Sequence, residues 1–235
     1  WRSVAQELGV YPNVIFEPYN EPNGDTVAEA TWFRVLQQVI DAIRVISNNL
    51  IIVQWSYAAW WGATADDGRL NWITNFPLTG TNLVYSTHLY RFHNHLGPDR
   101  PFDYNTIKQR LTDMQYPWVG VTLNKPLLIG EIGANVWYTG VELTNELAAY
   151  QEILKILNEW GLSYVAWEWW VARAWALLTN VWSSYPSNQA GDILKVALSQ
   201  TVTPPPTPLV TLGRQVTALI AITFLYFLAK KIRGG

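Results

Sequence analysis

Five short apolar runs, separated by stretches of helical periodicity, constrain the fold of this chain more than any other feature. The runs cover residues 14–16, 50–55, 82–90, 126–131 and 163–170. They are largely continuous, without alternation of apolar and polar residues, which is typical of strands buried on both faces of a parallel sheet. Strands that alternate with helices are joined by crossovers, and crossovers produce parallel pairing. The pattern predicts an α/β fold, either a doubly wound sheet or a (β/α) barrel.

The segments between these runs are predicted to be helical. The clearest helix covers 27–47, where Thr26 and Glu29 have the Thr-x-x-Glu spacing of a capping box. Further helices are expected at 1–8, 107–114, 147–160 and 191–199. No glycine-rich phosphate turn follows the first apolar run, as a doubly wound nucleotide site would require. The barrel is therefore the favoured architecture.

Polar residues gather where the apolar runs end. In a (β/α) barrel the chemistry lies at these carboxyl ends. The residues found there are Asn20, Glu21, Gln54, Trp55, His88, Tyr90, Glu131, Trp167 and Glu168. Glycoside hydrolysis needs one carboxylic acid to protonate the leaving oxygen and a second carboxylate to attack the anomeric carbon or activate water. The two carboxylates Glu21 and Glu131 are the candidates for these tasks.

Four motifs occur in an order that resembles a known family. "NEP" at 20–22, "HLY" at 88–90, "IGEIG" at 129–133 and "YVAWEW" at 164–169 are similar to the ends of strands four, six, seven and eight of the glycoside hydrolase family 5 cellulase-type barrel. The resemblance covers roughly residues 1–200. It implies an incomplete (β/α)8 TIM barrel here, a catalytic domain over 1–200, retention of anomeric configuration, and a reaction that needs no cofactor and no metal.

The same resemblance implies a role for individual residues. Glu21 corresponds to the acid/base and Glu131 to the nucleophile. Asn20 corresponds to the residue that bonds the sugar 2-hydroxyl, and His88 and Tyr90 to the pair that flanks the nucleophile. Trp167 corresponds to the aromatic platform beside the cleaved sugar.

Tryptophan is abundant, with 14 residues in the chain, and flat indole rings stack well on pyranose rings. Trp55, Trp60, Trp61 and Trp169 are candidate substrate-binding residues, with packing in the core or in loops as an equal alternative. The three histidines, His88, His93 and His95, lie in one short stretch, but their spacing matches no common zinc motif and the chain has no cysteine. We therefore expect no metal site.

The chain shows fewer strands than the family barrel has. The first three strands of such a barrel would precede Trp1. A barrel without them exposes two sheet edges and its apolar interior. We expect the chain to be a fragment of a longer protein, inactive on its own.

The C-terminal segment differs in composition from the rest. A Pro/Thr-rich linker covers 201–208, an apolar segment 209–229 and a basic end 230–235. Twenty-one helical residues extend about 31 Å, close to the thickness of a bilayer core, so 209–229 is predicted to be a transmembrane helix that anchors the protein in a membrane. The basic end predicts a cytoplasmic C-terminus and a catalytic domain outside the cell. A tail cleaved after export, with a secreted enzyme, and an amphipathic or buried helix remain alternatives.

The sequence thus predicts a cell-surface endo-β-1,4-glucanase acting on a β-glucan. Mannanase, xylanase or β-glucosidase activity would use the same catalytic residues, and a non-catalytic carbohydrate-binding protein is the alternative of another class. A net charge of −2, with no basic run before the extreme C-terminus, disfavours nucleic acid as a partner. The sequence indicates no obligate protein partner.

Overall fold

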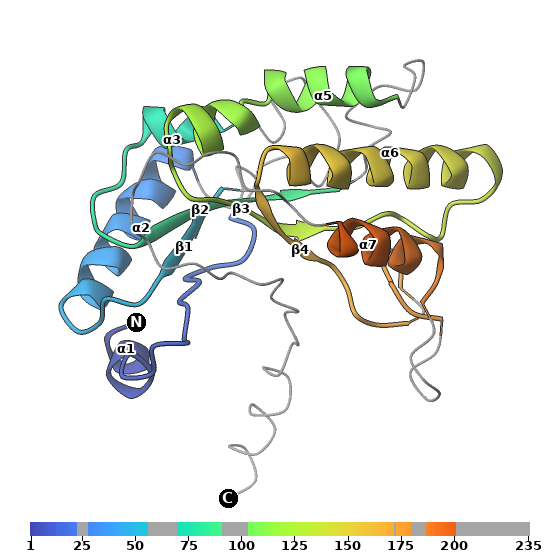
Figure 1. Cartoon of the computed structure of the whole chain (residues 1–235). Helices are drawn as coiled ribbons and strands as arrows, with labels where there is room; N and C mark the ends of the chain where they lie inside the picture. Colours follow the sequence, from blue (N-terminus) through green and yellow to red (C-terminus); the bar gives the residue numbers. More distant parts are fainter. Residues whose placement is uncertain (23–27, 56–69, 91–102, 172, 180–186, 201–235) are drawn as a thin grey trace, which may run out of the picture.

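The structure is a computed structural model that describes residues 1–22, 28–55, 70–90, 103–171, 173–179 and 187–200 (Figure 1). Within these residues four parallel strands form one sheet in the order β1-β2-β3-β4. The strands are β1 (Ile51–Gln54), β2 (Leu83–Leu89), β3 (Leu127–Ile132) and β4 (Ser163–Ala166). Each strand pairs with the next along the chain, so the predicted α/β class with parallel strands is confirmed.

The first predicted strand, 14–16, is reduced to a single bridge. Phe16 lies beside β1, donating its N–H to Leu50 (2.9 Å) and accepting from Ile52 (2.8 Å). The next rung of a parallel ladder would need the N–H of Pro18, which proline lacks. The predicted fifth strand, 163–170, is also shorter and ends at Ala166.

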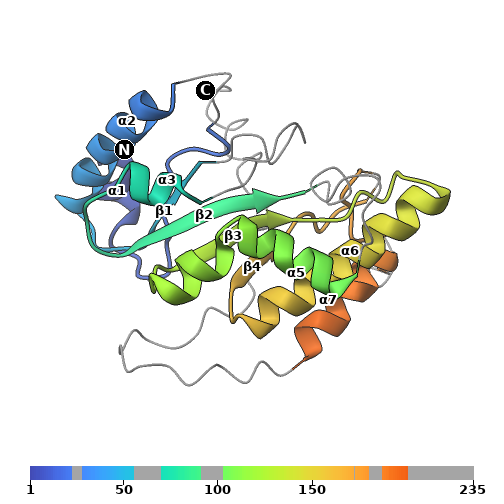
Figure 2. The same ribbon diagram turned by 90° about the horizontal axis from the view of Figure 1, so that it is seen from above.

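Seven helical elements are described around this sheet. They are α1 (Arg2–Leu8), α2 (Glu29–Arg44), α3 (Trp72–Asn75), α5 (Tyr104–Asp113), the π-helix η1 (Trp118–Thr122), α6 (Gly140–Glu159) and α7 (Gln189–Ser199). Figure 2 shows α5, α6 and α7 side by side along one side of the sheet, with α1 and α2 at the end nearest β1. The order is that of strands linked by crossover helices.

Two helix predictions need correction. The helix predicted at 27–47 is shorter and covers Glu29–Arg44, with Ala28 as its N-cap. Thr26 of the predicted capping box lies outside the described residues. In α1 the apolar residues Trp1, Val4 and Leu8 are about 40% exposed, and the small Ala5 is the buried residue.

Aromatic rings fill the core between α2, α3 and β1. Phe33 of α2 stacks on Trp72 with ring centroids 5.2 Å apart and on Phe76 at 5.0 Å. Trp55, at the end of β1, is only 9% exposed and lies 5.8 Å from Phe33. Trp55 is therefore a core residue, and its predicted role in substrate binding is not supported by this position.

Arg44, at the end of α2, closes the opposite end of the sheet. Its guanidinium donates to the carbonyls of Ser47 and Asn49 (both 2.9 Å) before β1, and to those of Thr81 (2.7 and 3.0 Å) and Asn82 (3.1 Å) before β2. The carbonyl of Asn82 also accepts from the backbone N–H of Ile51 (3.0 Å), so Arg44 adds to the pairing of β1 and β2 there. One cation thus contacts the loops that precede two neighbouring strands.

None of the helices in the described ranges is both long enough and apolar enough to cross a membrane. The linker, apolar segment and basic end predicted over 201–235 lie outside the described residues.

Candidate active site

A bulge between β2 and β3 brings His88 and Glu131 together. Thr87 pairs with Ile129, but His88 pairs with Glu131, so the ladder passes over Gly130. A bulge of this kind redirects the side chains that follow it. A Cβ on Gly130 would lie 2.5 Å from the Ser86 hydroxyl and 3.2 Å from the His88 ring. A larger residue would have to displace the Ser86 hydroxyl and press on the imidazole.

Glu21 reaches the same point from the segment that follows the Phe16 bridge. Its Oε1 lies 2.8 Å from Nδ1 of His88, and the same nitrogen lies 3.5 Å from Oε2 of Glu131. The His88 side chain is 2% exposed, while those of Glu21 and Glu131 are 25% and 16% exposed. The two carboxyl groups are thus reachable from solvent on either side of a buried imidazole.

Tyr90 holds the second carboxylate. Its phenol donates a 2.6 Å hydrogen bond to Oε2 of Glu131, and its ring lies 5.0 Å from that of Trp175. Burial raises the pKa of Tyr90 well above its ordinary value, and the charge of Glu131 raises it further. The phenol therefore stays protonated and acts as a donor to Glu131.

Burial also dominates the electrostatics of Glu131. Desolvation raises the pKa of Glu131, and the charges of Glu21 and Glu17 act in the same direction. The charge of His88 and the hydrogen bond from Tyr90 oppose this rise. The negative charge of Glu131 thus costs free energy in this position, and two neighbours reduce that cost.

The distance between the two carboxylates limits the chemistry. One oxygen from each of Glu21 and Glu131 and a ring nitrogen of His88 all lie within 4.8 Å of one another. Retaining glycosidases hold their two carboxyl groups about 5–5.5 Å apart, whereas inverting enzymes need about 6.5–9.5 Å. The close pair suits direct attack on a sugar. The same three atoms are near enough to bind a divalent cation, which is a second chemical capacity of this cluster.

The other predicted site residues lie around this cluster in different settings. Asn20 is exposed and directly precedes Glu21. Trp167 is half-buried, and its backbone N–H donates to the carbonyl of Ile132 (2.9 Å) at the end of β3. Trp169 is 41% exposed. Trp60 and Trp61 lie outside the described residues, as do His93 and His95.

Gln54 is a residue that the sequence places at a strand end of this region without assigning it a role. It ends β1, is 1% exposed, and contacts the segment that carries Glu21. The available signal was an uncharged amide at the end of an otherwise apolar run. Glu168, which had no predicted role, forms a 3.5 Å ion pair with Arg173, and burial raises its pKa.

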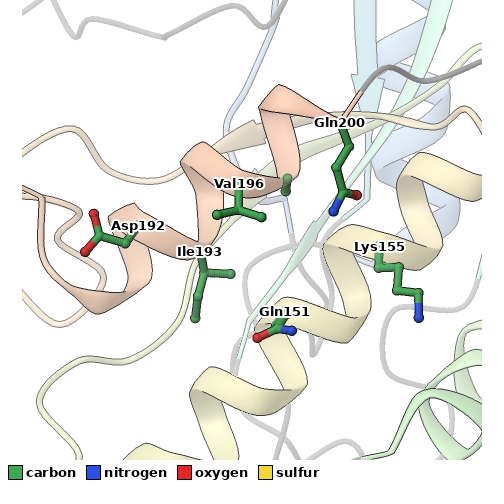
Figure 3. A pocket seen from close by; sticks show the side chains of 7 residues that line it. Gln151, Lys155, Asp192, Ile193, Val196 and Gln200 are labelled. Atoms are coloured by element: carbon green, nitrogen blue, oxygen red, sulfur yellow. The ribbon is translucent and has the colours of Figure 1, made fainter.

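A separate groove lies between α6 and α7 (Figure 3). It is lined by Gln151, Lys155, Asp192, Ile193, Val196, Ala197 and Gln200. Its carboxylate, Asp192, already lies 3.7 Å from Lys195 and accepts a hydrogen bond from Ser187. With one carboxylate in place of a facing pair, this groove does not have the groups for glycoside cleavage.

Comparisons with known proteins agree with this geometry. Residues 1–173 match the family described as Cellulase (glycosyl hydrolase family 5). An endoglucanase from Clostridium saccharobutylicum is 37% identical over 91 residues, which is 38% of this chain and 18% of that protein. Endoglucanase Z from Dickeya dadantii (strain 3937) is 32% identical over 95 residues, covering 38% of this chain and 19% of its own length.

Solved structures share the fold at low sequence identity. The endoglucanase Cel5A from Thermotoga maritima has a TM-score of 0.62 at 18% identity, over 84% of this chain and 63% of its own. The β-glucanase SdGluc5_26A from Saccharophagus degradans, solved with cellotetraose, has a TM-score of 0.63 at 19% identity, over 84% of this chain and 58% of its own. The chain therefore spans less than two thirds of these structures and about a fifth of the curated relatives.

Proposed function

Because the chain belongs to the cellulase family (glycosyl hydrolase family 5), we propose that it cleaves the β-1,4 bonds of a glucan as a retaining endoglucanase. The observation that carries this proposal is the Glu21–Glu131 pair, with carboxylate oxygens within 4.8 Å at the carboxyl end of a parallel sheet. The endoglucanases of C. saccharobutylicum and D. dadantii support the choice of substrate.

The proposed reaction has two displacements. In the first, the Glu131 carboxylate attacks the anomeric carbon while Glu21 gives its proton to the leaving oxygen, forming a glycosyl ester and releasing the shortened chain. In the second, Glu21, now a carboxylate, takes a proton from water as that water attacks the same carbon. The ester bond breaks, and Glu131 is regenerated as a carboxylate.

Neighbouring groups would prepare both steps. Tyr90 donates to Glu131 at 2.6 Å, which fixes the nucleophile and favours its charged form. His88 contacts both carboxylates and would fix their positions relative to each other. We assign Asn20 to the 2-hydroxyl of the sugar and the half-buried Trp167 to the face of the ring, as the family resemblance implies.

A mannan substrate is the second candidate. T. maritima Cel5A has been solved both with mannotriose and with cellobiose. Activity screens on carboxymethylcellulose, mannan and xylan would separate glucanase from mannanase and xylanase. An aryl β-glucoside in the same screen would report exo-acting β-glucosidase activity.

The stereochemistry of the first product tests the mechanism. We expect ¹H NMR of cellopentaose hydrolysis to show the β-anomer first, with the α-anomer appearing later by mutarotation. The α-anomer as first product would contradict the retaining assignment. If wild type and Glu131→Gln both bind cellopentaose and neither releases reducing sugar, the protein is a carbohydrate-binding protein.

We also propose that the protein acts at the cell surface through its C-terminal segment. Support comes from the sequence alone, in the apolar run 209–229 followed by Lys230, Lys231 and Arg233. Cell fractionation with a tag after Gly235 tests it. A tag found with the membranes supports a lasting anchor, and a tag absent from them excludes one.

A further inference from the structure

The side chain of Gln54 joins three alternate residues of the segment that leads to the acid/base. Its Oε1 accepts from the backbone N–H of Glu21 at 3.3 Å. Its Nε2 donates to the backbone carbonyl of Tyr19 at 3.0 Å and to the carboxylate of Glu17. Residues 17, 19 and 21 are thus all tied to one amide that is 1% exposed.

These contacts replace the strand pairing that Pro18 prevents. Beyond the Phe16 bridge no N–H at position 18 is available to continue the ladder with β1. Gln54 is the last residue of β1 and therefore lies where the missing rungs would be. Its own backbone is fixed too, because the indole of Trp32 donates to its carbonyl at 3.0 Å.

Glu21 needs such support because its backbone is in an unusual conformation. Its φ is +52°, in the left-handed region that costs a non-glycine residue free energy. An amide is the one side chain of this length that offers both an acceptor for the Glu21 N–H and a donor for Glu17 and Tyr19. Leucine or methionine would fill the same volume and leave these groups unpaired.

We propose that Gln54 is a positioning residue for the acid/base. It holds Glu21 against His88 through the hydrogen bonds that join Glu17, Gln54 and Glu21. This inference rests on the proposed glycosidase function. Gln54 itself touches no reacting atom in this scheme. It acts through the backbone of Glu21, and Glu17 orients its amide so that Oε1 points at that backbone.

The choice of leaving group separates a positioning role from a general structural role. Gln54→Met keeps length and volume but removes both ends of the amide. We expect kcat/KM on cellotetraose, whose sugar leaving group needs a proton, to fall about 100-fold, the lower range for a lost general acid. On 2,4-dinitrophenyl β-cellobioside, which leaves without a proton, we expect a fall of less than about 3-fold.

Gln37→Met is the matched control, because Gln37 makes its amide contacts to Asp41 and Thr79, away from the site. This variant should have the kcat/KM of wild type on both substrates. An equal fall on both substrates for Gln54→Met, or no fall on cellotetraose, overturns the positioning role.

Exchanging the two partners gives a second test should Gln54→Met fold poorly. Gln54→Glu alone places two carboxylates together, so activity on cellotetraose should fall and recover partly at acidic pH. Adding Glu17→Gln exchanges donor and acceptor between positions 17 and 54 and keeps an acceptor for the Glu21 N–H, while the Tyr19 carbonyl loses its donor. The double variant should therefore recover part of the kcat/KM that Gln54→Glu loses. A double variant whose kcat/KM on cellotetraose is no higher than that of Gln54→Glu alone overturns the proposed hydrogen-bond arrangement.

A crystal structure of Gln54→Met keeps the test independent of activity. If the wild type cleaves neither substrate, the proposed function fails, and the positioning role is still decided by coordinates. We expect Glu21 to leave its positive φ and its carboxylate to move out of hydrogen-bond range of His88. An unchanged Glu21 overturns the proposal.

Discussion

The two ends of the parallel sheet differ in how their charged groups are paired. At the carboxyl end, Glu21 and Glu131 face each other across His88, and burial raises the pKa of Glu131. At the amino end, the cation of Arg44 donates to carbonyls of two loops. The carboxyl end brings like charges together, and one of them, Glu21, has a positive φ. At the amino end, each described donor group of Arg44 has a carbonyl acceptor.

This contrast separates function from stability. Stability depends on the amino end, where loss of the Arg44 guanidinium would remove a charged donor from carbonyls of two loops. Chemistry requires the carboxyl end, where close carboxylates and a positive φ are costs that a structure without function would avoid. Substitutions at the two ends should therefore affect activity and stability in opposite patterns.

The largest expected effect is at Glu131, the proposed nucleophile. Glu131→Gln should lower kcat by on the order of 10⁴-fold or more, because no ester can form. Stability should change in the other direction. The raised pKa of Glu131 means that the folded protein binds this proton more tightly than the unfolded chain, whose value is near 4.5.

The tighter proton binding favours folding at pH values below the pKa of Glu131 in the unfolded chain. This contribution is lost as the pH rises through the pKa of Glu131 in the folded protein. At pH 7 the ionised carboxylate is a cost, and the glutamine variant lacks it. Thermal unfolding should thus give a higher Tm for Glu131→Gln at pH 7, with the difference shrinking at pH 4. A lower Tm at pH 7 would remove the contrast between the two ends of the sheet.

A smaller effect on activity is expected at Tyr90. Tyr90→Phe removes the donor to Glu131 and should lower kcat/KM by roughly 10- to 100-fold. The lost hydrogen bond favoured the charged carboxylate, so the pKa of Glu131 should rise further. The acidic limb of the kcat/KM profile should move to higher pH. A limb that stays in place or moves to lower pH would show that Glu131 does not govern it.

The smallest effect on activity is expected at the amino end. Arg44→Met should lower the free energy of unfolding by about 2 kcal/mol, because carbonyls of two loops lose a charged donor. At a temperature where the variant is folded, kcat/KM should equal that of wild type. Arg34→Met, on an exposed position of the same helix, should change stability by less than about 0.5 kcal/mol. Urea denaturation and initial rates measure both quantities.

The strands and the site residues differed in how well the sequence predicted them. Apolar continuity was sufficient for the four strands from Ile51 to Ala166, since buried parallel strands leave that signal. It failed for 14–16, where a single proline decides how far the ladder runs. Helical periodicity also overstated the length of α2, which covers Glu29–Arg44 and not the whole of 27–47.

For the site, motif order predicted which residues meet but not how they are held. Glu21, His88, Tyr90 and Glu131 come together as expected. The bulge at Gly130 and the amide of Gln54 depend on contacts between strands, which no local pattern encodes. Trp55 shows the converse, since an aromatic at a strand end was equally compatible with packing on Phe33.

The unpaired residue at Gly130 has a consequence for how this strand tolerates change in length. Without it, both ladders would pair one to one, with residue 131 still opposite His88 and Ile132 still opposite Leu89 and Ala166. The bulge that redirects the carboxylate would be gone. A shorter strand could therefore keep its pairing and still misplace the carboxylate of Glu131.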